Sequence, residues 1–70
     1  MKIFCERVKE LRTERRVYQR EVAEHLGITT RAYQNYEGGE SEPSQERLVA
    51  LADYFGVTTD YLLGRSDKRA

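Results

Sequence analysis

The stretch that most constrains this chain runs from Gln19 to Gly39 and reads QREVAEHLGITTRAYQNYEGG. Apolar residues recur at helical spacing on both sides of Gly27, which predicts two short helices rather than one long one. A glycine in this position can adopt the left-handed conformation that ends a helix, and Thr29 can cap the helix that follows. The stretch therefore predicts two helices joined by a tight turn.

The second of these helices has two different faces. With a step of about 100° per residue, four polar residues fall within roughly 140° of arc: Thr30, Gln34, Arg31 and Asn35. The apolar Ala32 and the aromatic Tyr33 and Tyr36 occupy the other arc and can pack inward. Arginine, threonine and carboxamide side chains are those that read base edges in the major groove of DNA. This helix is therefore the candidate DNA-reading element.

Apolar stripes and helix-ending glycines divide the rest of the chain into three more helices. The five predicted helices run from Ile3 to about Arg15, from Gln19 to Leu26, from Thr30 to near Glu37, from the Ser44 cap to Phe55, and from Thr59 to Leu63. No segment has the alternating pattern of a strand, and there is no internal repeat. We expect an all-α, compact five-helix bundle over residues 1–64, followed by a polar tail at 65–70.

Composition excludes several classes of protein. Seventy residues suffice for one domain that buries only about 60% of the surface of its unfolded chain. No apolar run approaches the ~18 residues of a membrane span, and no signal peptide opens the chain. Cys5 is the single cysteine and cannot form an internal disulfide. We expect a cytoplasmic protein without membrane contact.

The formal net charge is zero, but the charges are unevenly distributed. Residues 1–20 carry seven Lys/Arg and three Glu, and residues 37–60 carry a net charge of −5. A basic surface can attract phosphates while the acidic part faces elsewhere.

Nothing in the chain predicts an enzyme. There are no paired carboxylates in an apolar pattern, no nucleophile with a partner base and no glycine-rich loop after a strand. His25 stands alone, so we expect no metal, no cofactor and no small-molecule ligand. The alternative to DNA binding is a protein-binding module with the same helices, such as an antitoxin or a partner of another regulator. The zero net charge and the acidic segment 40–46 keep that alternative open.

The ordered set of residues resembles the helix-turn-helix repressors of the Cro and lambda-repressor type, the XRE-like transcriptional regulators. The resemblance covers residues 4–64 and is carried by three segments of the chain: Gln19-x2-Val22-Ala23-x2-Leu26-Gly27-Ile28-Thr29, Tyr33-x2-Tyr36-Glu37-x-Gly39 with Pro43-Ser44, and Leu48-x2-Leu51-Ala52 with Gly56-Val57 and Asp60-Tyr61-Leu62-Leu63-Gly64. It implies a lambda-repressor-like DNA-binding domain in which the second and third helices bind double-stranded DNA.

The resemblance also implies roles for single residues. Gln19 matches a phosphate contact at the start of the second helix, and Thr29 matches the turn residue that caps the recognition helix and can touch the backbone. Thr30, Arg31 and Asn35 match positions that face base edges or flanking phosphates, and Gln34 lies beside them. Two departures stand out: Tyr18 replaces the usual threonine or serine cap, and Glu40-Ser41-Glu42 stands where some members place lysines against DNA.

Family members of this kind repress by occupying a near-palindromic operator as two-fold dimers, with recognition helices about 34 Å apart. We therefore expect a homodimeric repressor. The last helix is the expected site of self-association, because Tyr61, Leu62 and Leu63 cannot all point inward on so short a helix. On this hypothesis Tyr61→Glu weakens operator binding without unfolding the monomer.

Overall fold

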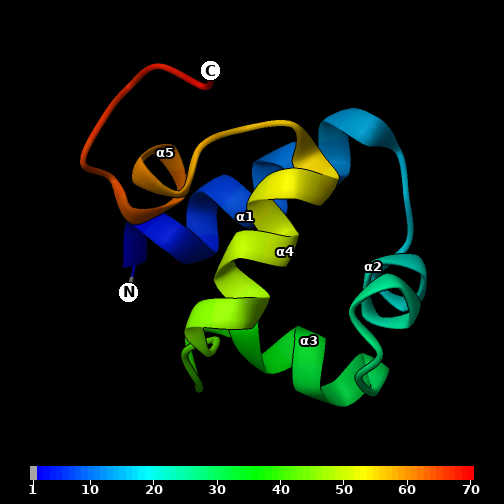
Figure 1. The fold of residues 1–70 in the computed structure, drawn as a ribbon. Helices are drawn as coiled ribbons and strands as arrows, with labels where there is room; N and C mark the ends of the chain where they lie inside the picture. Colours follow the sequence, from blue (N-terminus) through cyan, green and yellow to red (C-terminus); the bar gives the residue numbers. More distant parts are fainter. Residues whose placement is uncertain (1) are drawn as a thin grey trace.

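The protein is described here by a computed structural model of residues 2–70, which form five α-helices and no strand (Figure 1). The helices are α1 (Lys2–Arg15), α2 (Gln19–Leu26), α3 (Thr30–Gly38), α4 (Gln45–Phe55) and α5 (Thr59–Leu63). The all-α bundle is confirmed, and the helix boundaries agree with the predicted ones to within about a residue.

One hydrophobic core joins all five helices. α1 contacts both α3 and α5, α2 packs against α3, and α4 contacts α2 and α5. The buried side chains come from every helix: Phe4, Val8, Leu11, Val22, Ala23, Tyr33, Tyr36, Leu51, Ala52, Phe55, Tyr61 and Leu62. Because α1 touches partners at both ends of the bundle, it ties α3 at one end of the molecule to α5 at the other (Figure 1).

Local sequence signals set the helix ends. The hydroxyls of Thr29, Ser44 and Thr58 each accept a hydrogen bond from the backbone N–H three residues later, at 3.0, 3.2 and 3.0 Å. These contacts satisfy donors that the first turn of a helix leaves free. Tyr18 precedes α2 in the same extended conformation but makes no side-chain cap, as expected from its long ring.

The junction between α1 and α2 contains no glycine. Arg16 takes the left-handed conformation there, with φ of 57°, and its N–H donates to the Thr13 carbonyl at 3.1 Å. A residue with a Cβ adopts this conformation at a cost of about 1 kcal/mol. The turn therefore stores a small amount of backbone strain at Arg16.

The last helix differs from the expectation for self-association. Tyr61 and Leu62 are buried, and Leu63 is the residue that points outward, with 36% of its surface exposed. The Tyr61 ring lies between two guanidinium groups, those of Arg7 at 4.1 Å and Arg69 at 5.4 Å from its centroid. Tyr61 is therefore a core residue and not part of an exposed surface, and we expect Tyr61→Glu to lower the stability of the monomer because it replaces a packed ring with a charge.

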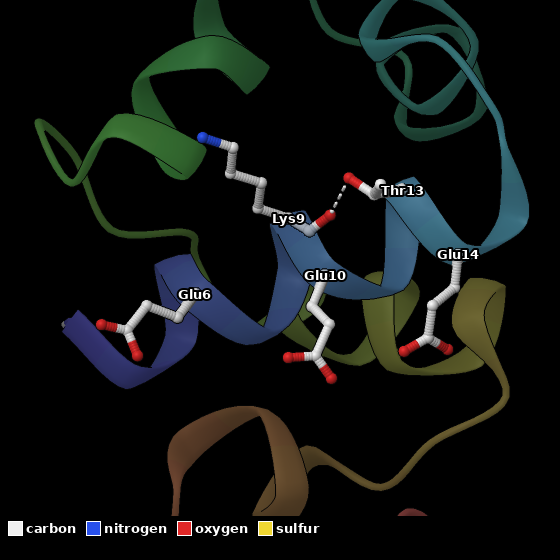
Figure 2. A pocket seen from close by; sticks show the side chains of 5 residues that line it. All are labelled: Glu6, Lys9, Glu10, Thr13 and Glu14. Carbon is white, nitrogen blue, oxygen red and sulfur yellow. Dashed lines mark hydrogen bonds between the residues drawn. The ribbon is translucent and has the colours of Figure 1, made fainter.

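The polar C-terminal segment 65–70 folds back over the bundle. The Arg69 carbonyl accepts from the Thr58 N–H at 2.9 Å, and the Arg69 guanidinium pairs with Glu10 at 3.0 Å and Glu14 at 2.8 Å. Figure 2 shows that Glu10 and Glu14 project from the side of α1 opposite Lys9. The segment thus connects α5 to α1 at the end of the molecule remote from α3 (Figure 1).

Candidate nucleic-acid interface

The two faces predicted for the third helix are present in α3. Tyr33 and Tyr36 are 0% and 4% exposed and belong to the core, whereas Arg31 and Gln34 are exposed. The remaining predicted contact residues of α3, Thr30 and Asn35, are half-buried. Burial of the tyrosine face fixes the rotation of α3 in the bundle, so its polar face must point to solvent.

Thr29 combines two possible roles at the start of α3. Its side chain is exposed, and its hydroxyl oxygen accepts from the Ala32 N–H. A hydroxyl used in this way as an acceptor keeps its own proton, which can still be donated to an anion. The first turn of a helix also carries partial positive charge. This end of α3 is suited to a phosphate.

The structure brings Gln19 and Gln34 together across the helix-turn-helix. The Gln34 amide nitrogen donates to the Gln19 amide oxygen at 3.1 Å, and the Gln19 amide nitrogen donates to Glu37 at 3.0 Å. Gln19 was predicted as a free phosphate contact, yet both ends of its amide already have partners within the protein. One amide N–H of Gln19 remains for an outside acceptor.

Glu37 connects this amide pair to α1. Its carboxylate accepts from the Arg12 guanidinium at two points, Nε to Oε2 at 2.6 Å and Nη2 to Oε1 at 3.2 Å. The side chains of Glu37 and Arg12 are only 4% and 18% exposed. Glu37 therefore has a structural role between α3 and α1. We refer to Arg12, Glu37, Gln19 and Gln34 as the Glu37 network.

The ionisation of Glu37 follows from this environment. Burial by itself raises the pKa of the carboxyl group, but hydrogen bonds from Arg12 and Gln19 and the nearby Tyr33 hydroxyl outweigh burial and lower the pKa below its usual value. The Tyr33 hydroxyl is buried without a partner at hydrogen-bond geometry. Glu37 is consequently a carboxylate at neutral pH.

Arg12 is largely buried although it carries a charge, with 18% of its side chain exposed. Arg12 follows the buried Leu11 and lies four residues after the buried Val8, so it borders the apolar stripe of α1. Its guanidinium also donates to the Val17 carbonyl at 3.0 Å. Two features of the sequence could have indicated this ion pair: the border position of Arg12 and an acid, Glu37, near the end of α3.

A second arginine supports the opposite side of α3. The Arg47 guanidinium, on α4, donates to the hydroxyl of the buried Tyr36 at 3.2 Å. This contact satisfies the polar end of a core side chain. α3 is therefore held from α1 through Glu37 and from α4 through Tyr36.

The surroundings of α3 are mixed in charge. Before α2, Tyr18 is 67% exposed, and the Arg20 guanidinium lies 5.8 Å from the centroid of its ring. After α3, Glu40 and Glu42 are exposed in the loop that leads to α4. Arg20 near the start of α2 lies 3.9 Å from Glu24, so the exposed charges there are of both signs, whereas the loop after α3 is acidic.

Two other features bear on the kind of site. Within residues 2–70, no group of three or more His, Cys, Asp or Glu side chains could hold a metal ion. In that same range no helix is both long enough and apolar enough to cross a membrane.

Comparisons with known proteins agree with this geometry. Residues 8–62 match the helix-turn-helix family. The chain is 43% identical over 61 residues to the SPbeta prophage-derived uncharacterized HTH-type transcriptional regulator YonR of Bacillus subtilis (strain 168), which covers 87% of this chain and 56% of that protein. It spans a little over half the length of the curated relatives it matches.

Two solved structures share the fold. The P22 c2 repressor in complex with a synthetic operator superposes with a TM-score of 0.80 and 29% identity, covering 84% of this chain and 89% of that chain. A transcriptional regulator from Listeria innocua superposes with a TM-score of 0.83 and 36% identity, covering 87% of this chain and 57% of that chain.

Proposed function

The chain belongs to the helix-turn-helix family, and from that premise we propose that it is a transcriptional regulator that binds a specific sequence of double-stranded DNA. The proposal assigns DNA binding to residues 1–64 and makes the protein a cytoplasmic regulator rather than an enzyme. The observation that carries it is α3, whose tyrosine face is buried while Arg31 and Gln34 are exposed beside it.

In this proposal the polar side chains of α3 contact different parts of the DNA. Arg31 is the main base contact, because an exposed arginine can bond the O6 and N7 atoms of guanine with two hydrogen bonds. Asn35 and Gln34 contribute carboxamides, which pair with adenine. Thr30 lies at the edge of the same face and contacts a base edge or a flanking phosphate.

Phosphates position the domain and carry no sequence information. We assign this task to Thr29, whose hydroxyl proton is available at the start of α3, and to Gln19, through the one amide N–H that the Glu37 network leaves unused. The exposed Tyr18 and Arg20 flank Gln19 in the sequence.

We further propose that the protein is a repressor and that it binds DNA as a homodimer. The P22 c2 neighbour is a repressor solved with an operator, and we propose that this protein likewise represses by occupying its site. A single recognition helix reads only a few base pairs, so useful specificity calls for two half-sites and a homodimer on a near-palindromic operator. We place that contact at α5, where Leu63 is an exposed apolar residue.

The competing function is a protein-binding module that kept the helices without DNA contact. The exposed acids after α3, Glu40 and Glu42, favour this alternative, because they repel phosphates on one side of the helix. The dependence of affinity on salt concentration distinguishes the two functions. Each phosphate neutralised by a cationic side chain makes the DNA affinity fall as salt rises, whereas a protein-binding module shows no such slope.

The test is selection of bound sites from a random duplex pool, followed by a salt titration on the enriched duplex. The proposal expects an enriched motif with two-fold character and an affinity that falls steeply with salt. Failure to enrich any motif contradicts the proposal and favours the protein-binding module.

A further inference from the structure

We propose that Glu37 is a positioning residue for sequence recognition, which fixes the orientation of the Gln19 amide and thereby decides which atoms Gln34 offers to a base. This inference rests on the proposed DNA-binding function. It concerns a carboxylate that contacts no base itself, because its side chain is 4% exposed and lies behind the recognition face.

The first step is the direction of the hydrogen bond between Glu37 and Gln19. An ionised carboxylate can only accept hydrogen bonds, and the Arg12 guanidinium already donates to both of its oxygens. The Gln19 group 3.0 Å from Oε1 must therefore be the amide nitrogen and not the amide oxygen. An amide that faced neutral partners on both sides could adopt either orientation.

The second step carries this orientation outward to α3. Because the Gln19 nitrogen points to Glu37, its oxygen points to Gln34 and can only accept. Gln34 must therefore turn its own nitrogen toward Gln19, which uses one of its two amide protons. The carbonyl oxygen and the second N–H of Gln34 remain unused, and Gln34 is exposed.

The third step concerns the base that the unused carbonyl oxygen and N–H of Gln34 can contact. One acceptor and one donor on a single carboxamide match the N6 amino group and N7 of adenine. A carboxylate at position 37 therefore holds Gln34 in one of its two amide orientations before DNA arrives. A glutamine at position 37 can donate or accept, so it no longer dictates the orientation of Gln19 or of Gln34.

The binding test measures discrimination at each base pair of the selected duplex for wild type and Glu37→Gln, each with Gln34 intact or replaced by alanine. We expect Glu37→Gln to reduce the discrimination at the base pair read by Gln34 by about 5-fold or more and to leave the guanine position read by Arg31 unchanged. In the Gln34→Ala background, Glu37→Gln should have no further effect on that base pair.

Glu21→Gln is the matched control, because Glu21 is an exposed glutamate on α2 outside the Glu37 network. It should leave discrimination at every position as in wild type. An equal loss at all positions on Glu37→Gln, or the same loss with and without Gln34, overturns the positioning role and makes Glu37 purely structural.

Gln19→Met is a second variant for the case that Glu37→Gln destabilises the fold. It breaks the link to Gln34 while the Arg12–Glu37 ion pair stays in place. It should reduce discrimination at the same base pair. In the free protein, NMR of the Gln34 side-chain amide should shift on Glu37→Gln and on Gln19→Met but not on Glu21→Gln. An unmoved Gln34 signal overturns the inference even without DNA, whereas a wild type that binds no DNA sequence overturns the proposed function.

Discussion

Arg12 and Glu37 form a two-point ion pair that joins α1 to α3 behind the exposed face of the recognition helix. The pair is 25 residues apart in sequence, and the amide of Gln19 shares one of its oxygens. The position of the candidate DNA-reading helix is thus set by a charged contact as well as by the burial of Tyr33 and Tyr36.

The first prediction concerns acid stability. The pKa of Glu37 is lower in the folded protein than in the unfolded chain. Its contribution to stability is therefore complete above the unfolded pKa of about 4.3 and is lost as the pH falls through the folded value. Urea unfolding from pH 7 to pH 2.5 should show the free energy of unfolding decreasing over the acid part of this range.

Glu37→Gln isolates this contribution. The variant leaves Arg12 without its counterion and should lower the free energy of unfolding by about 1–3 kcal/mol at pH 7. The difference between wild type and variant should shrink as the pH falls below the unfolded pKa of about 4.3 toward the lower folded pKa, because the unfolded chain then binds a proton at Glu37 that the folded protein does not. A difference that stays constant down to pH 2.5 contradicts the lowered pKa.

The second prediction concerns the strained turn at Arg16. Glycine adopts φ of 57° without the Cβ clash, so Arg16→Gly should raise the free energy of unfolding by about 0.5–1 kcal/mol. Thermal unfolding is the measurement, and an increase of a few degrees in Tm is expected. Lys9→Gly provides the control, because Lys9 is an exposed residue in the interior of α1, where glycine should lower Tm instead.

The third prediction compares two residues of α5, the exposed Leu63 and the buried Tyr61. Leu63→Glu adds a charge at an exposed position and should leave Tm nearly unchanged while weakening binding to the full operator. Tyr61→Glu puts a charge at a position that is 7% exposed and should unfold much of the protein. Sedimentation with and without operator duplex checks the assembly: two wild-type chains per operator are expected, and one chain per operator contradicts the homodimer.

The fourth prediction concerns the C-terminal segment. Arg69→Ala removes the ion pairs to Glu10 and Glu14 and one of the two guanidinium groups beside the Tyr61 ring. The variant should have a lower Tm than wild type at low salt, and the difference should narrow as salt screens these exposed pairs. Arg65→Ala, an exposed arginine of the same segment, should show no comparable loss.

Much of the fold could be predicted because its signals are local. Thr29, Ser44 and Thr58 were recognisable as caps from their places before periodic segments, and each makes the expected hydrogen bond. The two faces of α3 followed from the angular spacing of its residues, and the burial of Tyr33 and Tyr36 confirms them.

The remaining features depend on contacts between distant parts of the chain. Arg12 meets Glu37 across 25 residues, and Arg69 meets Glu10 across 59 residues. Helical periodicity says which side of a helix is apolar, but it does not say which charged side chains at the border meet one another. For the same reason the sequence did not show which of Tyr61, Leu62 and Leu63 points outward, since the two arginines that cover Tyr61 come from α1 and from the tail.

The most direct test of the account measures the affinity of wild type and Arg31→Ala for the selected duplex and for a scrambled duplex of the same composition. The account predicts that Arg31→Ala loses about 1–3 kcal/mol on the selected duplex, relaxes the preference at one base position and binds the scrambled duplex nearly as wild type does. Gln19→Ala should weaken binding to both duplexes through the lost phosphate contact and, on the selected duplex, also reduce discrimination at the base pair read by Gln34. An equal loss on both duplexes for Arg31→Ala would contradict the assignment of α3 as the element that reads the sequence.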